Sequence, residues 1–336
     1  MKAFLEQVLN GQDLTADQVS ALFNAMLAGE LDPNFIAGML IALRAKGESV
    51  VEIASAAKVM RAHAVAIPSP SGQILVDTCG TGGDLSGTFN LSTAAAITVA
   101  TMGAKVAKHG NRSVSSKAGS ADVLEALGVQ LGGPPERLAE ILQDVGISFL
   151  FAPAHHASTR HAVGPRKALG VRTIFNLLGP LTNPAGAQRQ ILGVFAAEWV
   201  EPIAQVLKEL GSEHALVVHG HGGLDELSIS GPTEVAELRN GVVTLHQVTP
   251  EQVGLDRGDL GTLAGGTAQD NAEILRSIFQ GERSPRADAV AFGAGAAAYV
   301  AGLHPSLKEG VQSARALLHS GKVQGTLTHL VHESQR

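Results

Sequence analysis

From residue 73 onward, short apolar runs alternate with stretches that carry a helical pattern. This alternation restricts the fold more than any other feature, because strands joined by helical crossovers pair in parallel. The runs are ILVDT, KVAK, ISFLFAP, ILGVFA and HALVVHG. A later stretch differs, because EVAELRNGVVTLHQV places the two-residue turn Asn240-Gly241 between alternating strands. We therefore predict an α/β domain with a mostly parallel central sheet and an antiparallel hairpin.

The first 65 or so residues predict helices only. Three residue pairs are typical of helix starts: Thr15 with Gln18, Asp32 with Pro33, and Ser49 with Glu52. Gly29 marks the end of the helix that the first pair opens. The stretch IPSPSG, residues 67–72, then interrupts the helical pattern with prolines and a glycine. We expect a small helical domain, residues 1–68, followed by an α/β domain, residues 73–336.

Composition excludes several classes of protein. A chain of 336 residues, 45% of them hydrophobic and 17% charged, can bury a sizeable core. Its net charge of −6 gives no overall attraction to nucleic acid or to an anionic membrane. A single cysteine allows no intrachain disulfide, and the N-terminal stretch lacks the apolar core of a signal peptide. We therefore expect a cytoplasmic protein.

The longest uncharged candidate for a membrane span is AVAFGAGAAAYVAGL, residues 289–303. It is rich in alanine and glycine and is shorter than the roughly 18 residues that a spanning helix needs. We predict a close-packed core helix at this position and no association with a membrane.

A glycine-rich loop, DTCGTGGD at residues 77–84, follows the first apolar run. Ligands of open α/β sheets bind beyond the carboxyl ends of the strands, and glycines there let backbone amides approach an anion closely. A tight turn that binds nothing explains the same residues equally well. The spacing excludes a dinucleotide fingerprint, which needs a glycine where Leu85 stands, and the chain contains no Walker loop. Cys79 is interpreted as a packed residue, since no histidine stands near it in the sequence.

Two further polar stretches follow other apolar runs. KHGNRSVSSKAGSADVLEALG, residues 108–128, places Lys108, Arg112 and Lys117 in a polar loop that suits an anion, although a solvated basic loop would have the same composition. In HGHGGLDELS, Asp225 and Glu226 follow HALVV. Adjacent carboxylates suit Mg²⁺ that is shared with substrate phosphates, and the alternative is a solvated turn.

Two other stretches carry weaker signals. His219 and His221 stand in alternate positions at the end of a strand, so their side chains diverge and a zinc site is disfavoured. FNLLGPLTNPA, residues 175–185, contains few titratable groups, and its prolines and glycine predict an ordered loop that shapes a site.

Together these stretches resemble the anthranilate phosphoribosyltransferase family. GTGGD with TFNLST, KHGNRSVSSKAGSADVLEALG, RTIFNLLGPLTNPA and GLDELS occur in the family's order and approximate spacing, over nearly the whole chain. The resemblance implies a helical domain, completed by mid-chain helices around residues 160–185, and an active site in the cleft beside the α/β domain. It also implies a homodimer, and a transfer that depends on one or two Mg²⁺ ions. In this transfer anthranilate attacks phosphoribosyl pyrophosphate, as a step of tryptophan biosynthesis.

The resemblance also implies roles for individual residues. Those that match the family's phosphoribosyl pyrophosphate contacts are Gly80, Gly83, Asp84, Thr88, Asn90, Ser92, Thr93, Lys108, Asn111, Arg112, Ser115, Ser116 and Ser120. Those that match its anthranilate contacts are Gly80, Asn111 and Arg166, with His109 and His156 as neighbours. Ser92, Asp225 and Glu226 match the metal position. No catalytic nucleophile is expected, because the main task is to stabilise the departing pyrophosphate, and an aromatic amine needs no strong base.

The chain departs from the family in two places. Gly293 stands where the family usually has asparagine, and HGHGG lacks the acidic residue that often precedes its last glycine.

A pyrimidine nucleoside phosphorylase of the same fold is disfavoured, because those enzymes lack the pair of acidic residues that Asp225 and Glu226 form here. A relative that binds nucleic acid is disfavoured by the net charge of −6 and by the presence of Asn111 and Arg166.

Overall fold

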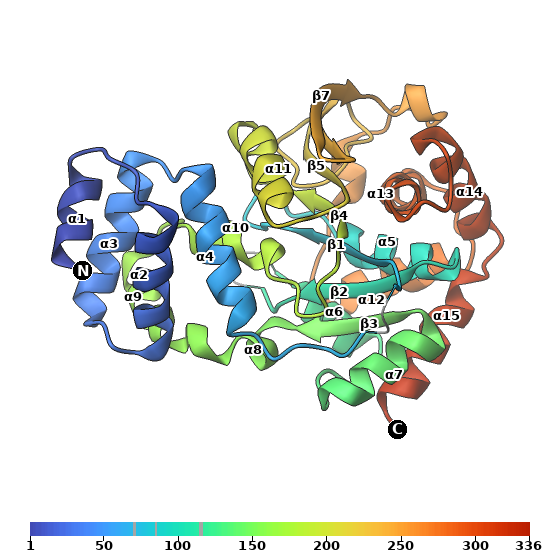
Figure 1. The fold of residues 1–336 in the computed structure, drawn as a ribbon. Helices are drawn as coiled ribbons and strands as arrows, with labels where there is room; N and C mark the ends of the chain where they lie inside the picture. The colour runs from blue at the N-terminus through green and yellow to red at the C-terminus, as the bar shows by residue number, and fades with distance from the viewer. Residues whose placement is uncertain (70–71, 85, 114–116) are drawn as a thin grey trace.

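The amino-terminal part of the chain is a bundle of helices (Figure 1). The computed structural model describes residues 1–69, 72–84, 86–113 and 117–336. The bundle contains α1 (Lys2–Leu9), α2 (Ala16–Ala28), α3 (Pro33–Lys46) and α4 (Val50–Ala62). The predicted helix starts are confirmed, since Thr15 and Ser49 form capping boxes and Asp32 caps α3 next to Pro33. Gly29 ends α2 with a φ of 77°.

A mid-chain segment returns to this bundle (Figure 1). It contains α8 (Ala152–His155), α9 (Arg160–Leu169) and α10 (Phe175–Leu178). Helix α9 packs against α2 and α3, and α10 packs against α4. The rings of Phe23 and Phe175 lie with their centroids 5.8 Å apart. Two segments far apart in the sequence therefore share one hydrophobic core.

The rest of the chain is built around a seven-stranded sheet in the order β3-β2-β1-β4-β5-β6-β7. Its strands are β1 (Leu75–Gly80), β2 (Lys105–Gly110), β3 (Ile147–Phe151), β4 (Arg189–Gly193), β5 (His214–Gly220), β6 (Thr233–Arg239) and β7 (Val242–Val248). The first five strands pair in parallel, and β6 and β7 are antiparallel. Asn240 and Gly241 join β6 to β7 with φ values of 52° and 75°, as the hairpin prediction required. The predicted fold class is confirmed.

Helices cover both faces of this sheet (Figure 1). They are α5 (Leu91–Thr101), α6 (Ser120–Ala126), α7 (Pro135–Val145), α11 (Val200–Glu209), α12 (Ala268–Phe279), α13 (Pro285–Ala301), α14 (Leu307–His319) and α15 (Val323–Ser334). Because a pleated strand sends alternate residues to opposite faces, Ile191 and Leu216 join the core that contains α5 and α13. Leu192 and Val217 join the core that contains α11 and the helical bundle. This second core is continuous from the bundle to the sheet.

The alanine-rich stretch at residues 289–303 is a core helix, as predicted. Most residues of α13 are buried against α5 and α14. Gly293 allows α13 to lie close to α5, because a Cβ atom at this position would lie 3.3 Å from the Cβ of Ala95. Among the helices that the structure describes, none is long and apolar enough to cross a membrane.

Replacing Gly295 with alanine is expected to destabilise the protein by roughly 2–3 kcal/mol. A Cβ atom at Gly295 would lie 2.3 Å from backbone atoms of Val311, so α13 and α14 would have to move apart. Gly325 provides the matched control: it lies in α15 with no atom within 4 Å of the added carbon, and alanine there should stabilise the helix by about 0.5–1 kcal/mol. Urea denaturation of both variants measures the difference, and equal stabilities would contradict the packing argument.

Candidate active site

Three strands of the sheet end in glycines that contact one acidic segment. These are Gly80 of β1, Gly193 of β4 and Gly220 of β5. A Cβ atom at Gly193 would lie 1.6 Å from the backbone oxygen of Asp225, and one at Gly220 would lie 2.3 Å from that of Glu226. At Gly80 the added carbon would lie 2.5 Å from the Oδ2 atom of Asp225. Only glycine at these strand ends lets the acidic segment lie this close to the sheet.

Asp225 and Glu226 are held by backbone amides of the neighbouring loops. Oδ2 of Asp225 accepts a hydrogen bond of 2.7 Å from the Gly82 amide, and Oε1 of Glu226 accepts one of 3.0 Å from the Ser92 amide at the start of α5. Burial and the mutual proximity of the carboxylates, including Asp84, raise the pKa of both Asp225 and Glu226. The crowded negative charge makes this position favourable for a cation.

The residues at this position fit a Mg²⁺ ion that the protein shares with the phosphates of a substrate. Glu226 contacts the Ser92 amide and Asp225 contacts the Gly82 amide, and Mg²⁺ bound with phosphates commonly takes one or two protein carboxylates and completes its shell with water. The described residues contain no group of three or more His, Cys, Asp and Glu side chains that could hold a metal by themselves. The donor set therefore suits a magnesium ion that arrives with a pyrophosphate.

Lys108 lies elsewhere than the sequence indicated. It was expected in a polar loop, but β2 continues to Gly110, so Lys108 is a buried strand residue. Its Nζ donates to the Thr78 carbonyl at 2.5 Å and approaches Oγ of Ser92 at 3.4 Å. Burial lowers the pKa of Lys108, and the buried carboxylate of Asp77 opposes that shift. The composition of the following loop had concealed how far the strand continues.

Asp77 is a site residue whose role the sequence did not indicate. Its carboxylate accepts hydrogen bonds from the His109 amide at 3.1 Å and from Nδ2 of Asn183 at 2.8 Å. Asn183 also donates to the Ala107 carbonyl, which ties the stretch FNLLGPLTNPA to β2. The predicted shaping function of that stretch agrees with these contacts.

The glycine loop leaves backbone amides available. Gly82 and Gly83 have φ values of 66° and 74°, and within the described part of the chain the N–H groups of Gly83 and Asp84 have no hydrogen-bond partner. Cys79 is a free thiol packed near Gln190, and burial raises its pKa well above the usual range. The interpretation of Cys79 as a packed residue is confirmed.

Other residues proposed for the phosphate side surround the start of α5. Asn90 donates to the Ala118 carbonyl at 3.2 Å and accepts from Asn271 at 2.9 Å. Thr93 is buried, and its hydroxyl has no partner among the described residues. Thr88 precedes them and pairs with Ala264 in an isolated bridge.

The second loop is only partly described, since Ser115 and Ser116 lie outside the described residues. Ser120 donates to the Asn111 carbonyl at 3.2 Å. The guanidinium of Arg112 contacts Asp122 at 2.9 Å and Glu125 at 2.5 Å. In this conformation Arg112 is therefore bound by two acidic side chains of α6, the helix that follows its loop.

Two buried histidines, His109 at the end of β2 and His156 after α8, contact each other. The rings of His109 and His156 lie with centroids 5.2 Å apart, and neither Nε2 atom has a partner among the described residues. Burial, followed by repulsion from neighbouring histidines, lowers the pKa of His109 to about 3 and that of His156 to about 4. Both imidazoles are therefore neutral at pH 7.

Arg166 lies in the last turn of α9. Its guanidinium stands 5.0 Å from the centroid of the Phe175 ring, and burial lowers its pKa. Among the described residues no carboxylate pairs with it. A partly buried arginine without an ion pair is suited to an anionic ligand.

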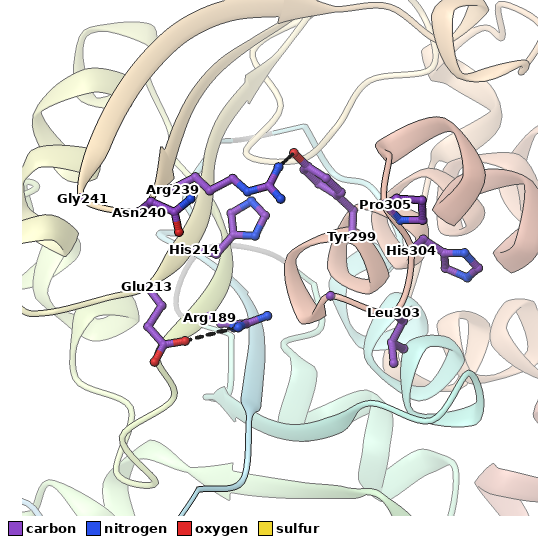
Figure 2. A pocket seen from close by; sticks show the side chains of 11 residues that line it. Arg189, Glu213, His214, Arg239, Asn240, Gly241, Tyr299, Leu303, His304 and Pro305 are labelled. Carbon is purple, nitrogen blue, oxygen red and sulfur yellow. Dashed lines mark hydrogen bonds and ion pairs between the residues drawn. The ribbon is translucent and has the colours of Figure 1, made fainter.

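A cavity of about 650 Å³ lies at the opposite, amino-terminal ends of β4 and β5 (Figure 2). Several of its polar side chains already pair with their neighbours. Arg189 pairs with Glu213 at 3.3 Å, and Nη1 of Arg239 donates to Oη of Tyr299 at 3.0 Å. The carboxyl-terminal edge of the sheet is the better candidate for a ligand site despite the size of this cavity, because it has crowded carboxylates and, as far as the structure describes the chain, loop amides without a partner.

The comparisons with known proteins agree with this geometry. Residues 2–64 match the helical bundle domain of a glycosyl transferase family, and residues 72–324 match the a/b domain of that family. The anthranilate phosphoribosyltransferase of Halorhodospira halophila is 51% identical over 98% of this chain and 97% of its own length. That of Thioalkalivibrio sulfidiphilus is 50% identical over 98% of both chains.

Solved structures give the same result. The crystal structure of anthranilate phosphoribosyltransferase from Thermus thermophilus superposes with a TM-score of 0.93, at 47% identity, over 99% of each chain. The enzyme from Saccharomyces cerevisiae in complex with phosphoribosyl pyrophosphate and Mg superposes with a TM-score of 0.89, at 28% identity, over 99% of this chain and 97% of that one. The resemblance seen in the sequence is confirmed, and the chain belongs to the anthranilate phosphoribosyltransferase family.

Proposed function

We propose that this chain performs the reaction of its family at the carboxyl-terminal edge of the sheet. The reaction joins the amine of anthranilate to the phosphoribosyl group of phosphoribosyl pyrophosphate and releases pyrophosphate, in tryptophan biosynthesis. The observation that carries the assignment is the buried pair Asp225 and Glu226, placed against three strand-end glycines and beside a loop whose Gly83 and Asp84 amides have no partner among the described residues. Crowded carboxylates next to unpaired N–H groups suit a magnesium pyrophosphate.

The phosphoribosyl pyrophosphate side is assigned to the glycine loop, the start of α5 and the second loop. The proposed contacts are Gly80, Gly83, Asp84, Thr88, Asn90, Ser92, Thr93, Lys108, Asn111, Arg112, Ser115, Ser116 and Ser120. The N–H groups of Gly83 and Asp84, which have no partner within the described residues, support this assignment, as does the 3.4 Å contact of Lys108 with Ser92. Ser92, Asp225 and Glu226 would hold Mg²⁺. When bound, the ion neutralises negative charge on the departing pyrophosphate.

The anthranilate side is assigned to Arg166, His109, His156, Gly80 and Asn111. A guanidinium can meet the anthranilate carboxylate with two parallel hydrogen bonds, and Arg166 has no competing ion pair among the described residues. The imidazoles of His109 and His156 are neutral at pH 7, so their unprotonated ring nitrogens can accept a hydrogen bond from the aromatic amine. Departure of pyrophosphate leaves an oxocarbenium-like ribose, so the amine attacks directly and no enzyme nucleophile is needed.

We further propose that residues 1–68 with the mid-chain helices form one domain and residues 73–336 the other, with the cleft between them. We also propose a homodimer formed through the helical domain. Exposed apolar side chains on its helices support this, among them Leu9, Val51 and Val163 with exposed fractions of 63%, 49% and 53%. A cytoplasmic location fits a biosynthetic enzyme with a single cysteine that allows no internal disulfide.

The loss of anthranilate fluorescence on mixing protein, phosphoribosyl pyrophosphate and Mg²⁺ tests the assignment. We expect the loss to require both substrates and the metal. Phosphorolysis of a nucleoside with no use of anthranilate would instead support the phosphorylase alternative. Retention on nucleic acid with neither activity would support the relative that binds nucleic acid.

Replacing Arg166 with alanine is expected to raise the KM for anthranilate by about tenfold to a hundredfold, because one charged pair with the carboxylate is lost. The KM for phosphoribosyl pyrophosphate should stay unchanged. Arg160→Ala is the matched control, since Arg160 is an exposed arginine of the same helix. Steady-state kinetics with each substrate varied in turn separates the outcomes, and equal changes in both KM values would contradict the assignment.

A further inference from the structure

Arg172 lies between the glycine loop and the helical bundle, in the segment that joins α9 to α10. Its Nη2 donates a hydrogen bond to the carbonyl of Gly83. Its guanidinium lies 4.2 Å from the centroid of the Phe195 ring, just beyond β4. The Phe195 amide in turn donates to Oγ1 of Thr81 at 3.0 Å. Arg172 and Phe195 together hold the glycine loop from its outer side.

The contact at Gly83 sets the direction of a loop amide. In a trans peptide the C=O and the following N–H point in opposite directions. When Arg172 holds the Gly83 carbonyl, the N–H of Asp84 is therefore directed away from the arginine. That N–H has no partner within the described residues. Gly83 adopts a φ of 74°, a conformation that a glycine can leave readily, so a fixed carbonyl matters here.

The same arginine is tied to the helical bundle. Nη1 of Arg44, in the last turn of α3, donates to the backbone carbonyl of Arg172 at 2.5 Å. On the other side of the loop, the Gly82 amide is held by Asp225. The glycine loop is thus held at Gly82 by Asp225 and at Gly83 by Arg172, whose backbone in turn contacts α3.

We propose that Arg172 is a positioning residue for phosphoribosyl pyrophosphate. It fixes the Gly83–Asp84 peptide so that the Asp84 N–H faces the pyrophosphate, and it links the loop to the bundle that supplies the anthranilate side. The proposal rests on the proposed function, in which phosphoribosyl pyrophosphate is the substrate that the glycine loop binds. Arg172 contacts the glycine loop and is not proposed to touch the reacting atoms. Its removal should therefore weaken the binding of phosphoribosyl pyrophosphate and leave the binding of anthranilate unchanged.

Titration calorimetry of phosphoribosyl pyrophosphate with Mg²⁺, together with steady-state kinetics, tests this. We expect Arg172→Ala to raise the Kd and the KM for phosphoribosyl pyrophosphate by about tenfold or more, with the KM for anthranilate unchanged. Arg172→Lys should recover part of the loss, because the charge remains but the planar donor does not. Phe195→Leu, which removes only the stacking surface, should cause a smaller shift in the same direction.

Arg239→Ala is the matched control. Arg239 also stacks on an aromatic ring, with its guanidinium 5.6 Å from the Tyr299 centroid, at the far edge of the sheet (Figure 2). It should leave the Kd unchanged. Should Arg172→Ala fail to fold, Arg172→Lys and Phe195→Leu decide the question by their Kd values.

Two results would overturn the proposal while leaving the proposed function intact. In one, the parent binds and turns over phosphoribosyl pyrophosphate but the Arg172 variants bind it equally well. In the other, both KM values and the thermal stability change together, which indicates a purely structural role. A parent protein that does not bind phosphoribosyl pyrophosphate at all would instead contradict the proposed function, and the proposal for Arg172 with it.

Discussion

The double variant Asp225→Asn, Glu226→Gln should lose about a thousandfold in activity, since the two carboxylates are proposed to hold the metal that stabilises the departing pyrophosphate. Metal stabilisation of such charge contributes several kcal/mol, and each 1.36 kcal/mol corresponds to a tenfold change in rate. Each amide side chain keeps one carbonyl oxygen, which can still accept the hydrogen bond from the Gly82 or the Ser92 amide. The measurement is Mg²⁺-dependent loss of anthranilate fluorescence.

The same variant should be at least as stable as the parent when no metal is present. Asp225 and Glu226 are buried near each other and near Asp84, and this crowding raises the pKa of both groups. A raised pKa means that the ionised carboxylates destabilise the fold near pH 7, and neutral amides remove that cost. Thermal unfolding in the presence of a chelator measures this effect.

Glu213→Gln is the matched control for the double variant. Glu213 is a carboxylate at the opposite edge of the sheet, where it pairs with Arg189 (Figure 2). Its replacement should leave activity unchanged. A double variant that keeps its activity, or that loses activity only because it unfolds at a lower temperature than the parent, would contradict the metal assignment.

Local sequence signals predicted the parts of the fold that local physics decides. The capping boxes at Thr15 and Ser49 depend on residues three positions apart, and the turn at Asn240-Gly241 depends on two adjacent φ values. The glycine loop and the Asp225 and Glu226 pair were found because they directly follow apolar runs. Their placement at one edge then follows from parallel pairing of the strands.

Contacts between distant segments could not be predicted in this way. Lys108 was expected in a loop because the stretch that it opens, residues 108–128, is polar in composition. What allows its burial is the Thr78 carbonyl and the carboxylate of Asp77, which lie 30 residues or so earlier in the chain. Arg172 opens the stretch RTIFNLLGPLTNPA, but its contact could not be predicted, since its partner Gly83 lies 89 positions away. The sequence spacing carries no information on such pairs without the fold.

The contact between Gly193 and Asp225 is another distant pair, and it leads to the second large expected effect. Gly193→Ala should abolish most activity and also destabilise the protein by roughly 2–3 kcal/mol. The added carbon would lie 1.6 Å from the backbone oxygen of Asp225 and 2.4 Å from its carbonyl carbon. Since these are backbone atoms, the whole acidic segment has to move away from the end of β4, and the metal carboxylates move with it.

Gly80→Ala separates the loss of activity from the loss of stability, because the carbon added at Gly80 contacts the side chain of Asp225 more closely than its backbone. Its added carbon would lie 2.5 Å from Oδ2 of Asp225, an atom that rotation of the side chain can displace. We therefore expect Gly80→Ala to lose activity with a smaller loss of stability than Gly193→Ala. Urea denaturation and the fluorescence assay on both variants, with Gly325→Ala as control, measure this order. If Gly193→Ala were as stable and active as the parent, the close approach of the acidic segment to β4 would be wrong, and the proposed metal site would lose its structural basis.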